Sequence, residues 1–233
     1  MAIWAISDLH LSLSSDKPMD VFGDHWIGHH DQMAAAWDDL VAPDDLVLVP
    51  GDNSWALKLD EAAADLNWIH ERPGTKMLLK GNHDYWWTGI GKVRAAMPHT
   101  LRALQNDTLE WKGYRIAGAR LWNQPGHRKF TDEDEKIYKR EIERLQLSLN
   151  LATKQCAKDG KELIVMVHYP PFRDGKPSIF TELIEATGTS TCIYGHLHGR
   201  NSHRRAFEGE HNGVNYHLVA CDYLNFSPIK LRD

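Results

Sequence analysis

The chain has 233 residues, of which 42% are hydrophobic and 25% charged, and its formal net charge is −5. A chain of this length and composition can bury a core of its own, which excludes a disordered segment and a disulfide-stapled mini-protein. The net negative charge does not favour a dedicated nucleic-acid-binding protein. We expect a single α/β domain over residues 1–233, with an insert around 102–158.

The cysteines and the N-terminal residues bear on the compartment. Cys156, Cys192 and Cys221 are odd in number and match no zinc or redox spacing, as is typical of proteins of the reducing cytosol. The first residues lack the basic region and the long apolar region of a secretory signal. No stretch approaches the roughly 18 consecutive apolar residues of a membrane-spanning helix. We therefore expect a cytoplasmic protein without integral membrane association.

Short apolar runs rich in β-branched residues predict the buried strands of an α/β sheet. Single strands are expected over 3–6, 46–49, 77–79, 163–167, 192–194 and 214–220, and a pair of strands within 109–119. Helices are expected over 29–41, 59–71, 85–97 and 178–187. The longest helix is predicted to begin after Thr131, whose hydroxyl precedes three acidic residues, and its apolar stripe extends to Cys156.

Polar residues follow several of these strands at the point where each strand ends. They form the blocks Asp8-Leu9-His10, Gly51-Asp52-Asn53, Gly81-Asn82-His83-Asp84, His168 and Gly195-His196-Leu197-His198. In open α/β sheets, ligands bind beyond the carboxyl ends of the strands. Among the side chains of these blocks, two carboxylates, one carboxamide and four imidazoles are candidate ligands. Such a set suits Mn, Fe or Zn better than Ca or Mg, and seven ligands are too many for one ion. The sequence therefore predicts a pair of divalent metal ions.

These blocks, in this order, resemble the signature of the calcineurin-like metallophosphoesterases, which is Asp-x-His, Gly-Asp, Gly-Asn-His-Asp/Glu, His and Gly-His-x-His. The resemblance extends from Asp8 to His198, which is most of the chain. It implies a layered α/β sandwich of two mixed β-sheets flanked by helices. It also implies metal-dependent hydrolysis of a phosphate mono- or diester.

The resemblance further implies which ion each ligand holds. One ion is held by Asp8, His10 and His198, the other by Asn82, His168 and His196, and Asp52 bridges both. A hydroxide between the two ions is the implied nucleophile, because two cations lower the pKa of a bound water to near neutrality. The expected metals are Mn, Fe or Zn, with Mn the one expected to support activity in vitro.

Two further residues are implied to take part in catalysis. His83 is the histidine that binds no metal and protonates the leaving oxygen or stabilises its charge. Asp84 is expected to orient His83 through the other ring nitrogen, which fixes the tautomer and raises the pKa of the imidazole.

Substrate contacts are expected outside the signature. Trp86 is a candidate wall for a base or sugar, and Arg173 and Arg200 are candidate phosphate contacts. The segment 120–131, which includes Arg128, lies within the expected insert and is a candidate cover for the metals.

We expect the substrate to be a small phosphoester. One alternative is a nuclease, since repair nucleases share these blocks, but the net charge and the lack of a long basic stripe do not favour nucleic acid. A second alternative is a catalytically silent scaffold on the same fold. Such a scaffold would be expected to lack His83 or several ligands, and this chain lacks none of them.

Overall fold

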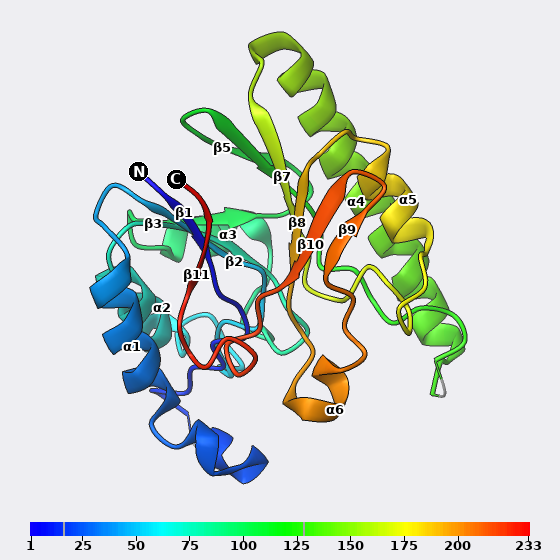
Figure 1. Cartoon of the computed structure of the whole chain (residues 1–233). Coiled ribbons are helices and arrows are strands. Elements are labelled where there is room, and N and C mark those ends of the chain that lie inside the picture. Colours follow the sequence, from blue (N-terminus) through cyan, green and yellow to red (C-terminus); the bar gives the residue numbers. More distant parts are fainter. Residues whose placement is uncertain (16, 128) are drawn as a thin grey trace. The chain divides into compact units, whose positions relative to one another are not determined.

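The computed structural model describes residues 1–15, 17–127 and 129–233. The described chain forms two compact units, one of residues 1–103 with 219–233 and one of residues 104–218. Each unit contains one mixed β-sheet that carries helices (Figure 1). This confirms the prediction of an α/β fold with two mixed sheets flanked by helices. Arg128, in the segment predicted to cover the metals, lies outside the described residues.

The sheet of the first unit has five strands in the order β11-β1-β2-β3-β4. The strands are β1 (Ile3–Ala5), β2 (Leu46–Val49), β3 (Thr75–Leu79), β4 (Leu101–Leu104) and β11 (Ile229–Arg232). The first three run parallel, and β11 pairs antiparallel with β1. All residues of β1 and β2 are buried, as expected of parallel strands in an α/β fold. The loops that follow the three parallel strands therefore all start at the carboxyl end of this sheet.

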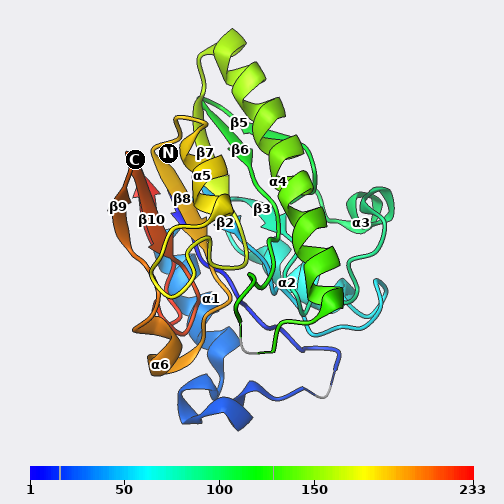
Figure 2. The ribbon, with the colours of Figure 1, turned by 90° about the vertical axis from the view of Figure 1, so that its right-hand side faces the viewer.

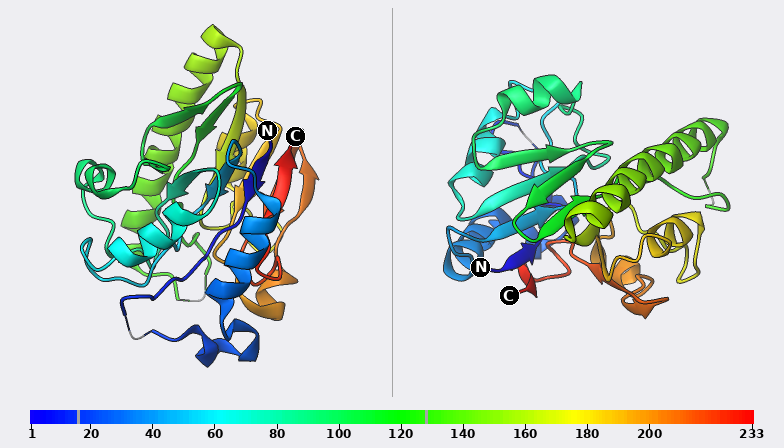
Figure 3. Two further views of the ribbon diagram at one scale, coloured as in Figure 1. Left: turned by 90° about the vertical axis from the view of Figure 1, so that its left-hand side faces the viewer. Right: turned by 90° about the horizontal axis from the view of Figure 1, so that it is seen from above.

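Three α-helices and two 3-10 helices belong to the first unit. They are η1 (Met19–Phe22), η2 (Asp24–Trp26), α1 (His29–Leu40), α2 (Ala63–Glu71) and α3 (Ile90–Ala96). Trp37 of α1 and Ile69 of α2 join Val47 and Val49 of β2 in one hydrophobic core, and Figure 3 shows these helices packed along the sheet. The helix expected over 85–97 begins only at Ile90, because the preceding residues form a tight turn in which the Trp87 N–H donates to the Asp84 carbonyl.

The sheet of the second unit has six strands in the order β5-β6-β7-β8-β10-β9. They are β5 (Thr108–Trp111), β6 (Tyr114–Ala117), β7 (Glu162–Met166), β8 (Thr191–Tyr194), β9 (Gly209–His211) and β10 (Val214–Leu218). The four central strands are parallel, and the edge strands β5 and β9 are antiparallel to their neighbours. The pair predicted within 109–119 is confirmed as β5 and β6.

The second unit contains α4 (Asp132–Asp159), α5 (Ile179–Glu185) and α6 (Gly199–His203). The start predicted for the longest helix is confirmed, because the Thr131 hydroxyl accepts from the Asp134 N–H in a reciprocal capping box. Its buried residues include Leu145 and Leu149, and α4 packs against β6, β7 and α5 (Figure 2). Among the described residues, no helix is both long and apolar enough to cross a membrane.

Candidate metal centre

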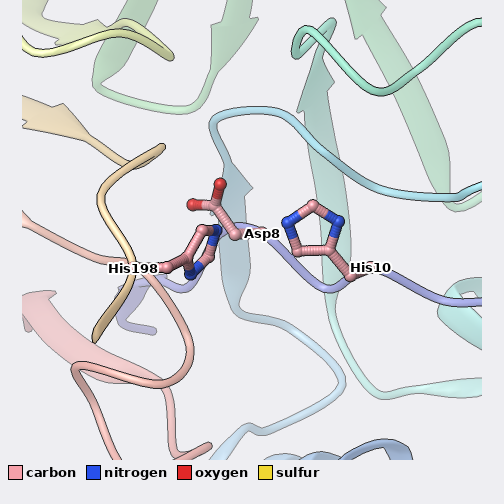
Figure 4. A group of neighbouring side chains, drawn as sticks. All are labelled: Asp8, His10 and His198. Carbon is pink, nitrogen blue, oxygen red and sulfur yellow. The ribbon is translucent and has the colours of Figure 1, made fainter. Parts of the chain in front are cut away.

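The loop after β1 carries the first two predicted ligands, Asp8 and His10 (Figure 4). Its backbone is hydrogen-bonded to the loop after β2: the Asp8 N–H donates to the Gly51 carbonyl at 3.0 Å, and the His10 N–H to the Asp52 carbonyl at 3.0 Å. A ligand atom of Asp8 and one of His10 lie within 4.8 Å of each other. The two loops thus hold three predicted ligands in one place within the first unit.

Asp52 connects this pair of loops to the loop after β3. Its side chain is 1% exposed. One carboxylate oxygen, Oδ1, accepts a hydrogen bond from the His83 N–H at 2.8 Å, and Oδ2 lies 3.7 Å from His10 Nε2. Asp52 therefore lies between a predicted metal ligand and the backbone of the predicted catalytic histidine.

Gly81 allows the loop after β3 to approach Asp52 closely. A Cβ atom built on Gly81 would overlap Asp52 Oδ1 and the Asp52 backbone nitrogen. A larger residue at this position would therefore displace either Asp52 or the segment that carries Asn82 and His83.

Four predicted ligands have a left-handed backbone conformation, which side chains other than glycine rarely adopt. The φ angles are 58° at Asp8, 44° at His10, 52° at Asp52 and 71° at His196. Each such residue costs on the order of 1–3 kcal/mol, and strained residues of this kind cluster at functional sites. Seven other non-glycine residues of the described chain, Lys112 and Leu121 among them, share this conformation, so it marks a site only where it coincides with ligand-type side chains.

Asp84 does not take the place expected from the sequence. Its Oδ1 accepts from the Asn53 N–H, the Ser54 N–H and Trp86 Nε1, and its Oδ2 accepts from Asn53 Nδ2 and the Gly81 N–H, at 2.7–3.1 Å. The carboxylate therefore braces the loops after β2 and β3 instead of orienting His83 through its ring nitrogen. Complete burial, and then the nearby Asp52 carboxylate, raise the pKa of Asp84 to about 6.

Trp86 is fully buried, and its indole N–H donates to Asp84. The substrate contact expected of Trp86 does not fit this burial, because no face of its ring is left for a ligand. Tyr85, the preceding residue, is 55% exposed. Of the three consecutive aromatic residues Tyr85-Trp86-Trp87, Tyr85 is thus the one that solvent reaches.

Trp55 was not identified from the sequence. Its ring stacks on His10, with centroids 5.0 Å apart, and contacts the His83 ring at a centroid distance of 4.3 Å. Its indole N–H donates to Met19 Sδ at 3.2 Å. Trp55 therefore packs against a predicted ligand and the predicted catalytic histidine at once. Its position three residues after Asp52 was the available signal.

The second unit positions three predicted ligands beyond its central strands. His168 follows β7 and is fully buried, and His196 follows β8. The Gly195 N–H donates to the His168 carbonyl at 3.1 Å, and a ligand atom of each imidazole lies within 4.8 Å of the other. His198, half-buried, is the residue before the first turn of α6.

The two arginines predicted to contact phosphate differ in their surroundings. Arg173 lies in the lining of a pocket in the second unit, and His196 belongs to the same lining. Arg200 is exposed on α6, outside this lining.

The chemistry of the donors fits divalent ions. Asp8 and Asp52 are buried carboxylates in the same unit, together with the fully buried Asp84. Burying several carboxylates close together costs free energy, and a bound cation offsets that cost. The imidazoles of the second unit are nitrogen donors of the kind that Mn, Fe and Zn accept.

Comparison with known proteins identifies relatives and a similar fold. Two curated relatives, the "Gene 66 protein" of Mycobacterium phage L5 and that of Mycobacterium phage D29, are 38% identical over 81 residues and 34% identical over 87 residues. Each match covers 35% of this chain, and the chain spans only 39% and 40% of the length of these relatives. A solved structure, the phosphopantetheinyl hydrolase of Mycobacterium tuberculosis, has a similar fold, with a TM-score of 0.56 and 15% identity over 94% of this chain and 88% of that chain.

A family model described as calcineurin-like phosphoesterase matches residues 1–200. The matched range includes residues of both units and contains the seven predicted ligands, His83 and Asp84. Because the match covers well over half of the sequence, the chain belongs to the calcineurin-like phosphoesterase family.

Proposed function

We propose that this chain is a metal-dependent phosphoesterase that uses two divalent ions, with Mn the preferred metal in vitro, to hydrolyse a small phosphate mono- or diester. The observation that carries the proposal is that three predicted ligands, Asp8, His10 and Asp52, are buried and are held together by backbone hydrogen bonds between the loops after β1 and β2. The family match over both units supports the same activity.

The ligand assignment follows the family signature. One ion would be held by Asp8, His10 and His198, the other by Asn82, His168 and His196, with Asp52 shared between them. The ions, when bound, supply positive charge that makes a coordinated water acidic enough to act at neutral pH and that neutralises the phosphate. This assignment makes residues 1–233 one phosphoesterase domain, with the residues around 102–158 as its insert.

His83 is proposed to donate a proton to the leaving oxygen. Its backbone N–H is held by Asp52 and its ring contacts Trp55. These two contacts help to position the imidazole. Asp84 acts on the site indirectly. It accepts hydrogen bonds from the Gly81 N–H and from the Asn53 N–H in the adjoining loop, and so holds the two loops in place.

The cysteines favour a reducing compartment. Cys156, Cys192 and Cys221 are free thiols, and the last two are fully buried. We therefore place the protein in the cytoplasm.

The test is hydrolysis by the purified full chain after removal of metal and addition of Mn, Fe or Zn. The substrates are p-nitrophenyl phosphate, its diester, and single-stranded DNA and RNA oligonucleotides. Mn-dependent hydrolysis of the small esters is expected. Absence of hydrolysis with every metal would show a silent scaffold, and turnover confined to oligonucleotides would show a nuclease.

A substitution separates catalysis from metal binding. His83→Ala should lower turnover by about a hundredfold or more while the metal content stays unchanged, because general acid catalysis contributes about that much. The matched control is His99→Ala, a histidine of the same unit that contacts His70 instead. Full activity of His83→Ala would overturn the role given to this residue.

A further inference from the structure

A pocket of about 200 Å³ lies entirely within the second unit. Part of each of three segments lines it, within 122–127, 169–174 and 202–207, in addition to His196 and Leu197; His203 and Arg204 are not in the lining. Because His196 is a proposed metal ligand, an occupant of this pocket would border the reacting phosphate. This step rests on the proposed function.

Aromatic rings form two walls of the pocket. Tyr169 stacks on His196, with ring centroids 3.9 Å apart, and also contacts Trp122 at a centroid distance of 5.1 Å. Phe172 and Phe207 stack on each other, with centroids 4.0 Å apart and an angle of 18° between the ring planes. Tyr169 and Phe172 are buried, whereas Trp122 and Phe207 are only partly buried. The two partly buried rings are the ones that can offer apolar surface to a planar ligand.

Hydrogen bonds fix the segments that carry these rings. Gln124 Nε2 donates to the carbonyls of Pro170 and Pro171 at 3.3 Å, and Arg173 Nη1 donates to the Pro125 carbonyl. The indole N–H of Trp122 donates to Asp134 at 2.8 Å. The pocket is therefore preformed, which lowers the entropy cost of binding.

The polar residues of the lining favour an anion. Arg173 and Arg205 contribute two positive charges, and Asp174 contributes one negative charge. Both arginine side chains are exposed, so each guanidinium can reach a ligand at the pocket mouth. Because the metal ions already neutralise the phosphate that is hydrolysed, guanidinium groups beside aromatic walls suit a second anionic group on the substrate.

We propose that this pocket selects a phosphoester whose organic part contains a planar ring and a second anionic group, which is the chemistry of a nucleotide with more than one phosphate. Phe207 and Trp122 hold the ring, and Arg205 and Arg173 hold the second phosphate. The phosphate to be hydrolysed lies on the His196 side.

The test compares three phosphate monoesters with the full chain in Mn. Adenosine 3′,5′-bisphosphate has the ring and a second phosphate, adenosine 5′-monophosphate has only the ring, and ribose 5-phosphate has neither. We expect kcat/KM to fall about tenfold at each step, which is the scale of one charge-assisted hydrogen bond or one stacked ring. Equal values for all three, or a preference for an aliphatic ester such as pantetheine 4′-phosphate, would overturn the inference.

Two substitutions assign the contacts. Arg205→Gln should remove most of the difference between bisphosphate and monophosphate, and Phe207→Leu most of the difference between monophosphate and ribose phosphate. The controls are Arg204→Gln, an exposed arginine outside the lining, and Phe130→Leu, whose ring contacts Tyr138. Both controls should keep the parent ratios, and a control that changed them as much as its partner would overturn the assignment.

A binding measurement separates this inference from the proposed function. Equilibrium dialysis of adenosine 3′,5′-bisphosphate against metal-free protein should show binding that Arg205→Gln weakens about tenfold. Binding without hydrolysis of any ester would leave the pocket assigned and overturn the proposed function. Hydrolysis of p-nitrophenyl phosphate without this binding would do the reverse.

Discussion

In the first unit a buried carboxylate, that of Asp84, ties together the loops that carry predicted ligands, whereas in the second unit the aromatic ring stacked on a predicted ligand also lines a pocket. Asp84 accepts five hydrogen bonds from residues of two loops, and Asp52 accepts from the loop after β3. In the second unit, Tyr169 stacks on His196 and also lines the pocket.

This difference indicates that the two units have different roles. Under the proposed function, the first unit would supply the carboxylate ligands, held by buried polar groups, and would set the charge balance of the metal site. The second unit would supply imidazole ligands, one of which, His196, also lines the pocket, and would influence which substrates reach the metals. Substitutions in the first unit should therefore affect every substrate alike, whereas those around the pocket should affect substrates unequally.

The largest effect is expected for Asp52→Asn. It removes the carboxylate proposed to be shared by both ions, and turnover of every small ester should fall by about a thousandfold or more, with loss of bound metal. Metal analysis together with p-nitrophenyl phosphate assays checks both effects. Asp60→Asn, at an exposed position of the same unit, is the control. Full activity and full metal content in Asp52→Asn would contradict the role given to the first unit.

The next effect concerns Lys76, a fully buried lysine whose Nζ donates to the carbonyls of His70, Arg72 and Gly74. Burial, and then the charge of Arg72, lower the pKa of Lys76 from 10.5 to about 8. The unfolded chain therefore binds this proton more tightly, and the free energy of unfolding rises with pH between about 8 and 10.5, by up to about 3 kcal/mol.

Urea unfolding at several pH values checks this sign. Lys76→Met should lack the rise, whereas Lys58→Met, at an exposed lysine of the same unit, should keep it. Identical pH dependence in the parent and in Lys76→Met would contradict the prediction.

Gly81→Ala tests the close approach of the loop after β3 to Asp52. The added methyl group must displace Asp52 or the backbone before Asn82. We expect turnover to fall by about a hundredfold, since a displacement of about 1 Å can cost that much. Gly91→Ala in α3 is the control, because its added methyl group meets no atom within 4 Å. Equal activity of the two variants would show that position 81 accepts a methyl group without displacing Asp52 or the loop after β3.

The smallest effect is expected for Trp55→Leu. Loss of the ring that contacts both His10 and His83 should lower kcat about tenfold and leave KM and metal content unchanged, because Trp55 acts by positioning. Trp55→Phe should restore part of kcat. Trp68→Leu, at a tryptophan that packs against the same core from α2, is the control for a loss of stability. A change confined to KM would instead make Trp55 a substrate contact.

Much of the fold followed from local patterns. The apolar run at 46–49 coincides with β2, and the acidic turn after Thr131 coincides with the start of α4. Both depend on neighbouring residues, so they can be inferred locally. β4 and β11 were not predicted: their apolar and charged residues alternate too briefly, and each is defined by its partner in the sheet.

The site was predictable in its residues but not in all its bonds. Asp8, His10 and Asp52 could be found because each follows a recognisable strand. The partners of Asp84 could not, because Asn53 and Ser54 lie about thirty positions away and only the parallel pairing of β2 and β3 brings the loops together. For the same reason the burial of Trp86 was not foreseen.

The pairing of β1 with β11 has a consequence for the order of folding during synthesis. The backbone around Asp8 is tied to the end of the chain, since the Ser7 N–H donates to the Val219 carbonyl and Cys221 Sγ to the Asp8 carbonyl. The first unit therefore surrounds the second in sequence, and its sheet cannot be completed until β11 has been synthesised, because β11 pairs with β1. The second unit is continuous in sequence, so all of its strands are available before β11.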